Sequence, residues 1–176
     1  LVVSSAGRIV GATLGNDVNL RDLEGRSALL LGKAKDNNAS ATIGPFVRLF
    51  DRDFGLDDVR QAEVRLVVEG PDGFRLDGLS AMSRISRDPE DIVGQTICAE
   101  HQYPDGFVLY LGTMFAPTKD RGAPGEGFTH KIGDVVSIES PLLGRLTNKM
   151  VLSPDAERWT FGTAALMRNL PKRGLL

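Results

Sequence analysis

The stretch EVRLVVEGPDGFRLDG at positions 63–78 decides the fold class of this chain. Val64, Leu66 and Val68 alternate with charged residues, which predicts a strand with one buried face and one largely wet face. The Pro-Asp-Gly turn at 71–73 then leads the chain back into FRLDG, so the segment is expected to form a β-hairpin.

Short apolar runs between turn residues continue on both sides of this hairpin. Twenty glycines and nine prolines separate them, which is typical of a β-rich fold with many turns. Helices are expected in only two places. One begins at Asp88, with a proline at its first position, and runs through IVGQTICAEH. The other covers TFGTAALMRNL and is stopped by Pro171 and Gly174. Further strands are expected at 8–14, 46–50, 107–112 and 135–139. The predicted fold class is therefore α+β and β-rich, with few short helices.

The bulk composition excludes several classes of protein. The chain has 176 residues, which suits one domain, and its formal charge of −2 provides no field for nucleic acid or an anionic membrane surface. No apolar run approaches the roughly 20 residues of a membrane span. The single cysteine, Cys98, cannot form an internal disulfide and is expected to be a small core residue. These features predict a cytoplasmic protein.

The first residues carry a separate expectation. The chain opens LVVSS, with no initiator methionine and no signal-like segment, as if it were already inside a strand. We therefore expect residues 1–176 to be a piece of a longer polypeptide.

The run GNDVNLRDLEG at 15–25, followed by Lys35, is the strongest candidate for a site. Asp17 can complete a divalent-cation site whose other oxygen ligands come from elsewhere. Lys35 can act as a general base if its surroundings favour the neutral amine. The alternative is a hydrophilic loop in which Asp17 caps a turn, Arg21 pairs with a carboxylate and Lys35 faces water. Residue types alone leave both interpretations open.

Other catalytic signatures are missing from the sequence. There is no Gly-x-Ser-x-Gly nucleophile elbow and no Gly-x-Gly-x-x-Gly dinucleotide fingerprint. The glycine-rich loop at 122–128 lacks the Gly-Lys-Ser/Thr of a phosphate-binding loop. His101 and His130 have no companion at metal-ligand spacing and are expected in loops or on the surface.

Four segments in order resemble the fumarylacetoacetate hydrolase family. They are GNDVNLRDLEG, LGKAKDNNASATIGP, YPDGFVLYLGT and GDVVSIESPLLGRLTNK, and they span essentially the whole chain. The ending WTFGTAALMRNLPKRGLL looks most like the branch of 2-keto-3-deoxy sugar-acid dehydratases. The resemblance implies a mixed β-sandwich or β-roll, and it makes residues 1–176 a C-terminal catalytic domain truncated at its N-terminus.

The resemblance also implies a metal site and an assembly. The family binds Mg²⁺, with Mn²⁺ or Ca²⁺ as alternatives, through a Glu-x-Glu pair and an aspartate that Asp17 matches. The Glu-x-Glu pair would lie upstream of Leu1, as would the lid that carries a His–Glu dyad in the hydrolases. The family commonly forms homodimers or higher homo-oligomers.

Individual residues take roles from the same resemblance. Counting back from Pro45 of the Ile-Gly-Pro motif selects Lys35 as the base, with Lys33 as the alternative. Arg21 matches a substrate-contacting arginine, and Thr113 matches a threonine that bonds the substrate carboxylate. Glu24 stands where many hydrolases carry glutamine, a departure that favours a dehydratase.

The predicted function is a metal-dependent lyase that dehydrates a 2-keto-3-deoxy sugar acid through an enolate. A 2-keto-3-deoxypentonate, for example, would become 2-oxoglutarate semialdehyde. The first alternative is a C–C hydrolase of acylpyruvates or diketo acids. The second is a non-catalytic family member. The expected partner is a small 2-oxo acid, with no nucleic acid and no membrane.

Overall fold

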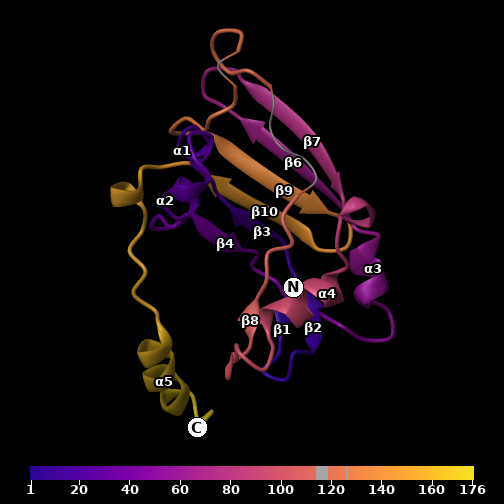
Figure 1. The fold of residues 1–176 in the computed structure, drawn as a ribbon. Helices are drawn as coiled ribbons and strands as arrows, with labels where there is room; N and C mark the ends of the chain where they lie inside the picture. Colours follow the sequence, from indigo (N-terminus) through magenta and orange to yellow (C-terminus); the bar gives the residue numbers. More distant parts are fainter. Residues whose placement is uncertain (114–118, 126) are drawn as a thin grey trace.

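A computed structural model describes residues 1–113, 119–125 and 127–176, and Figure 1 shows the arrangement. The strands are β1 Val2–Val3, β2 Ile9–Ala12, β3 Gly15–Asp17, β4 Ala41–Ile43, β5 Arg48–Leu49, β6 Glu63–Glu69, β7 Arg75–Ala81, β8 Phe107–Val108, β9 Val135–Ser140 and β10 Gly144–Lys149. The helices are α1 Arg21–Glu24, α2 Leu31–Lys35, α3 Leu56–Arg60, α4 Pro89–Thr96 and α5 Thr163–Lys172, with 3-10 turns at Ala28–Leu30, Met82–Arg84 and Ser153–Asp155.

The predicted hairpin forms one side of the larger sheet, whose strand order is β10-β9-β6-β7, with β6 inside the sheet and β7 at its edge. β6 and β7 pair antiparallel from Glu63 opposite Ala81 to Glu69 opposite Arg75, so the predicted hairpin is present. Val68 is completely buried, but Val67 on the opposite face is also only 8% exposed. Glu63, Arg65 and Glu69 on this second face are exposed, so the face is largely wet as predicted and Val67 is its buried exception.

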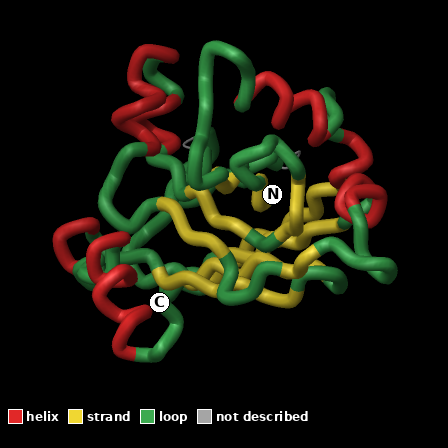
Figure 2. The backbone as a smooth tube through the Cα atoms, turned by 90° about the horizontal axis from the view of Figure 1, so that it is seen from below, coloured by secondary structure: helices red, strands yellow, loops and turns green. Residues whose placement is uncertain are grey.

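A second sheet has the order β5-β2-β1-β8, and β3 pairs with β4 in a separate two-stranded sheet. Every strand pairing among the described residues is antiparallel. Figure 2 shows the strands gathered in the middle of the molecule and the helices at its margins. The β-rich class with few short helices is therefore confirmed. The strands at 8–14, 46–50 and 107–112 form only in part and are shorter than predicted.

Two hydrophobic clusters hold these sheets. One surrounds Val68 and Val136 on the larger sheet and includes Leu14, the residue just before β3. The other joins Leu1 and Val3, at the start of the β5-β2-β1-β8 sheet, to Phe54 and to residues of α3 and α4. Because Leu14 is only 4% exposed, it anchors β3 to the larger sheet.

Both predicted helices are present, with different ends. Asp88 caps α4 by accepting a hydrogen bond from the Glu90 amide at 2.9 Å, but the helix ends at Thr96 rather than continuing to 101. α5 does not stop before Pro171; it includes this proline and ends at Lys172. Gly174, with φ of 67°, then closes the end in a Schellman motif.

Cys98 is not a core residue, and the sequence prediction for it is wrong. It is exposed, because the chain leaves α4 two residues earlier and turns into a short bridge with His101. None of the helices in the described part of the chain has the length and apolar character needed to cross a membrane.

Candidate functional site

Asp17 is held at the end of β3 by backbone pairing. Its cross-strand partner is Ala41 of β4, and the next residue, Val18, donates its amide to the Ser40 carbonyl at 2.9 Å. The Asp17 side chain is 38% exposed, so its carboxylate is open to solvent or a ligand. The fold therefore presents this carboxylate on a strand end rather than on an unsupported loop.

Lys35 lies directly against Asp17. Its Nζ atom is 2.6 Å from Asp17 Oδ2 and 3.5 Å from the Asp17 carbonyl oxygen. Lys33 is two residues earlier in α2, so it projects from a different side of the helix and is exposed. The structure brings together the predicted aspartate and the favoured lysine, whereas the alternative lysine lies outside this pair.

Backbone bonds fix α2 beside β3. The Leu20 amide donates to the carbonyl of Ala34, a completely buried residue, at 3.0 Å. The Ser40 hydroxyl donates to the Lys35 carbonyl at 2.7 Å. Ala39, in the same loop, has φ of 59°, a conformation that L-residues adopt at a cost. The loop that returns from Lys35 to β4 is thus tightly determined.

Arg21 and Glu24 pair with each other on α1, with Arg21 Nη1 3.4 Å from Glu24 Oε2. The same Glu24 oxygen also accepts from Asn19 Nδ2. Asn19 Oδ1 is buried and has no hydrogen-bond partner among the described residues. Two of the three predicted substrate-binding residues, Arg21 and Glu24, therefore form their own cluster with Asn19.

Thr113 is exposed at the last residue before 114–118, and its predicted contact with substrate stays a prediction. Tyr110, three residues earlier, contacts the two-stranded β3–β4 sheet that carries Asp17, and the sequence did not reveal this neighbour. A Cβ on Gly15 would lie only 2.5 Å from Tyr110 Cε1, so the ring packs closely on β3. Partial burial, together with the negative charge of Asp17, raises the pKa of Tyr110. Its hydroxyl thus stays protonated and donates to the Thr42 carbonyl at 2.8 Å.

The described residues supply one carboxylate for a metal ion, not a complete set. No cluster of three or more histidine, cysteine or acidic side chains that could hold an ion occurs in the ranges the structure covers. Asp17 suits the oxygen preference of Mg²⁺, which can be held by one or two carboxylates with water and substrate as further ligands. These residues by themselves therefore do not fit a closed metal centre.

A second polar cluster surrounds Asp134, a buried residue just before β9 of the larger sheet. Arg121 is 2% exposed and donates to both oxygens of the fully buried Asp134, at 2.5 and 2.7 Å. It also reaches Asp72 at 2.9 Å. Burial alone would raise the pKa of Asp134, but the hydrogen bonds from Arg121 and from the Lys131 amide together lower it. Because every charge here has a protein partner, the cluster reads as structural.

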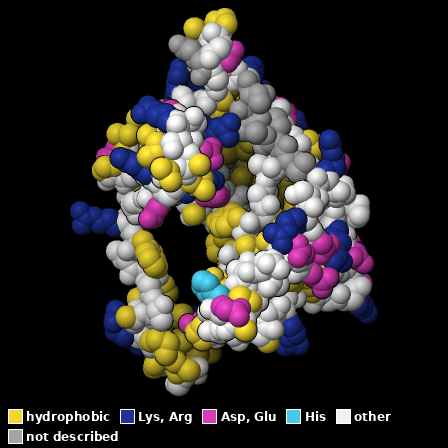
Figure 3. Space-filling model, in the orientation of Figure 1, with side chains coloured by type: hydrophobic (Ala, Val, Ile, Leu, Met, Phe, Trp, Pro, Cys, Tyr) yellow, Lys and Arg dark blue, Asp and Glu magenta, His cyan; other side chains and the backbone are white. Residues whose placement is uncertain are grey.

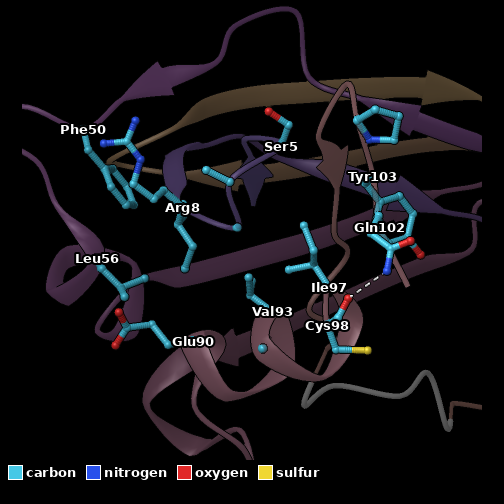
Figure 4. A pocket seen from close by; sticks show the side chains of 15 residues that line it. Ser5, Arg8, Phe50, Leu56, Glu90, Val93, Ile97, Cys98, Gln102 and Tyr103 are labelled. Atoms are coloured by element: carbon cyan, nitrogen blue, oxygen red, sulfur yellow. Dashed lines mark hydrogen bonds between the residues drawn. The ribbon is translucent and has the colours of Figure 1, made fainter. Parts of the chain in front are cut away.

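A cavity of about 890 Å³ opens between α4 and the first turn of the chain (Figure 4). Its walls are largely apolar, with Val93 and Ile97 on one side and Phe50 and Leu56 on another. Cys98 lies at its edge, where Gln102 Nε2 donates to the Cys98 carbonyl at 3.3 Å. None of the predicted site residues lines this cavity.

The sequence and the fold of the chain are similar to those of 2-keto-3-deoxy sugar-acid dehydratases, over about half of the length of those proteins, so the predicted resemblance to this branch is confirmed. No family model matches the chain.

The matched relatives carry the names of particular sugar-acid dehydratases. The chain is 29% identical over 149 residues to the 2-dehydro-3-deoxy-D-arabinonate dehydratase of Saccharolobus solfataricus, covering 83% of this chain and 45% of that protein. It is 28% identical to a probable 2-keto-3-deoxyxylonate dehydratase of Haloferax volcanii, covering 85% and 48%. A solved 2-keto-3-deoxy-D-arabinonate dehydratase, complexed with magnesium and 2,5-dioxopentanoate, superposes with a TM-score of 0.69 at 26% identity, covering 85% and 49%. The chain therefore spans about half the length of these relatives.

Proposed function

We propose that the protein is a metal-dependent hydro-lyase that dehydrates a 2-keto-3-deoxy sugar acid. The observation that carries this proposal is the contact between Lys35 Nζ and Asp17 Oδ2 at 2.6 Å, formed by two residues that the dehydratase resemblance assigns to base and metal ligand. The similarity to sugar-acid dehydratases, one of them bound to magnesium and a dioxopentanoate, supports the substrate class.

The chemistry assigned to this chain is proton transfer and orientation. Mg²⁺, when bound, acts as a Lewis acid that polarises the ketone of a 2-oxo acid. Lys35 is the proposed base and takes a proton from C3 of the substrate. The hydroxyl on C4 then leaves as water with the proton that Lys35 took from C3, and the product tautomerises to the dehydrated 2-oxo acid. Arg21 and Thr113 hold the substrate carboxylate, and Glu24 orients Arg21 through the pair at 3.4 Å.

Asp17 would hold the ion together with further ligands, and these ligands are not among the described residues. We propose that these are the two carboxylates that the resemblance places before Leu1. Replacing Asp17 by Asn should abolish or strongly weaken Mg²⁺ binding measured by calorimetry on the full-length protein. Asp22, whose side chain is 59% exposed and pairs with Arg26, provides the matched control: Asp22→Asn should bind Mg²⁺ like the wild type.

The substrate experiment is direct. Full-length protein incubated with a 2-keto-3-deoxypentonate and Mg²⁺ or Mn²⁺ should release 2-oxoglutarate semialdehyde, identified by mass spectrometry and NMR. Absence of turnover with both ions would overturn the dehydratase proposal. Cleavage of an acylpyruvate instead would assign the site to the hydrolase class.

We propose further that the protein acts in the cytoplasm as a homodimer or a higher homo-oligomer. Large apolar side chains support an interface: Leu29 is 94% exposed, Phe46 77% and Trp159 84%. Apolar side chains cover much of the outer end of the α5 segment in Figure 3, and α5 has no buried residue. Light scattering coupled to size exclusion should give a mass of at least two chains, and a monomeric mass would contradict this proposal.

A further inference from the structure

The two-stranded β3–β4 sheet that carries Asp17 is tied to the rest of the protein by side chains from two other segments, β10 and the stretch after β8. Asn16 of β3 and Thr42 of β4 are cross-strand partners. Both donate to one atom, Asn148 Oδ1 of β10, at 3.0 Å from Asn16 Nδ2 and 3.3 Å from Thr42 Oγ1. The side-chain oxygen of Asn148 in the larger sheet is thus hydrogen-bonded to both strands of the β3–β4 sheet.

Tyr110 holds the same cross-strand row through a different atom. Its hydroxyl donates to the backbone carbonyl of Thr42 at 2.8 Å, and its ring lies against the Cα of Gly15 so closely that no Cβ fits between them. Asn148 binds the side chains of the row, whereas Tyr110 binds the backbone carbonyl of Thr42 within it and packs on the preceding residue of β3, Gly15. Asp17 is the residue that follows this row on β3.

We propose that Asn148 and Tyr110 are positioning residues that together set the placement of the Asp17 carboxylate relative to Lys35. The inference rests on the proposed function for its catalytic meaning, but the geometry stands without it. Asn148 is rigidly placed, because β10 pairs with β9 along six consecutive positions, Asn148 opposite the buried Val136. The larger sheet thereby fixes a two-stranded sheet that has little core of its own.

We call the hydrogen bonds of Asn148 and Tyr110 with the β3–β4 sheet the clamp. The physical reason for the clamp is the small size of this two-stranded sheet. Each strand has three residues, and most of their side chains are exposed or half-buried. A pair of strands this short is not stable alone in water. Leu14 supplies an apolar anchor at the start of β3, and the clamp supplies polar anchors up to the residue before Asp17. Residues that position a metal ligand in this way typically change metal affinity or activity by about 10- to 100-fold when removed.

The test compares four variants of the full-length protein. Asn148→Ala removes the shared acceptor, Tyr110→Phe removes the hydroxyl and keeps the ring, and Asn148→Asp keeps an acceptor of the same shape. Thr147→Ala is the matched control, because this neighbouring β10 residue pairs with Ser137 of β9 instead. Two readouts are measured: Mg²⁺ affinity by calorimetry, and the acylation rate of Lys35 relative to exposed Lys33 by mass spectrometry.

Asn148→Ala and Tyr110→Phe should weaken Mg²⁺ binding about tenfold or more and raise the Lys35-to-Lys33 acylation ratio severalfold. Asn148→Asp and Thr147→Ala should leave both readouts near the wild-type values. Unchanged readouts in Asn148→Ala and Tyr110→Phe, or an equal change in Thr147→Ala, would overturn the clamp. If Asn148→Ala does not fold, Tyr110→Phe decides the question alone. Failure of the wild type to bind Mg²⁺ or turn over substrate would overturn the proposed function instead, while the acylation ratio still decides the clamp.

Discussion

Lys35 Nζ and Asp17 Oδ2 lie 2.6 Å apart, although eighteen positions of sequence separate the two residues. Neither side chain is buried, with 33% and 38% exposed, so their attraction alone contributes little to folding. Their proximity comes instead from the backbone bonds between β3, α2 and the loop 36–40. A pair placed by the fold rather than by its own energy is what a catalytic arrangement requires.

Lys35 should be far more important for activity than Lys33. Lys35→Met removes the proposed base and should lower kcat by about 10²- to 10⁴-fold, the usual contribution of general base catalysis. Lys33→Met, two positions away on the exposed side of α2, should keep kcat within about twofold of the wild type. Steady-state kinetics with a 2-keto-3-deoxypentonate measures both. The opposite ranking would make Lys33 the base.

Arg121 should be among the most important polar side chains for stability. Arg121→Met leaves the fully buried carboxylate of Asp134 without its cation and should cost about 3–5 kcal/mol in unfolding free energy. Replacing both residues, as Arg121→Met with Asp134→Leu, should recover much of this loss, since no buried charge then remains. Chemical denaturation provides the measurement. Arg65→Met breaks an exposed pair with Asp77 and should change stability little, so equal losses in the two single variants would contradict the prediction.

His130 should make stability depend on pH just below neutrality. Burial lowers its pKa below the ordinary value of 6.5, against the opposing effect of Asp134. The unfolded chain therefore binds more protons than the folded one in this window. The stabilisation is complete above about pH 6.5 and is lost as the pH falls through the folded pKa. Urea denaturation at several pH values should show this decline in the wild type.

His130→Gln should flatten the dependence in that range. His101→Gln is the control, since His101 is exposed and stacks on Tyr103, and it should keep the wild-type decline. A decline that persists in His130→Gln would assign it to other groups.

Gly106, in the YPDGF segment, should not tolerate a side chain. Its φ is 77°, and a Cβ would lie 2.3 Å from the Val3 carbonyl oxygen of β1. Gly73 has nearly the same φ of 78° but open space around it. Gly73→Ala should therefore cost only the conformational strain, about 1–2 kcal/mol. Gly106→Ala should cost a further amount of about 1–3 kcal/mol, because backbone must move. Thermal unfolding of the two variants tests the difference, and equal losses would show that the contact with β1 relaxes freely.

The elements that could be predicted from the sequence are those specified by neighbouring residues. The hairpin at 63–78 formed where it was expected because its alternation and its turn agree. The start of α4 formed at Asp88 because the capping side chain and the first-turn proline are local signals. Cys98 and the end of α5 were wrong, since exposure and the tolerance of Pro171 in the last turn depend on where the helix lies in the fold.

The candidate site divides in the same way. The sequence by itself raised Asp17 and Lys35 as a candidate metal ligand and a candidate base, and the family resemblance selected Lys35 over Lys33. It did not reveal Asn148 or Tyr110, although Asn148 shares its strand face with buried Leu146 and could have been noted as a polar residue on an apolar face. Hydrogen bonds that span 132, 106 and 68 positions have no signature in local sequence. These hydrogen bonds depend on the packing of β10 and of the segment around Tyr110 against the β3–β4 sheet. Only the tertiary structure decides them, because side chains so far apart in sequence meet only after the sheets have formed.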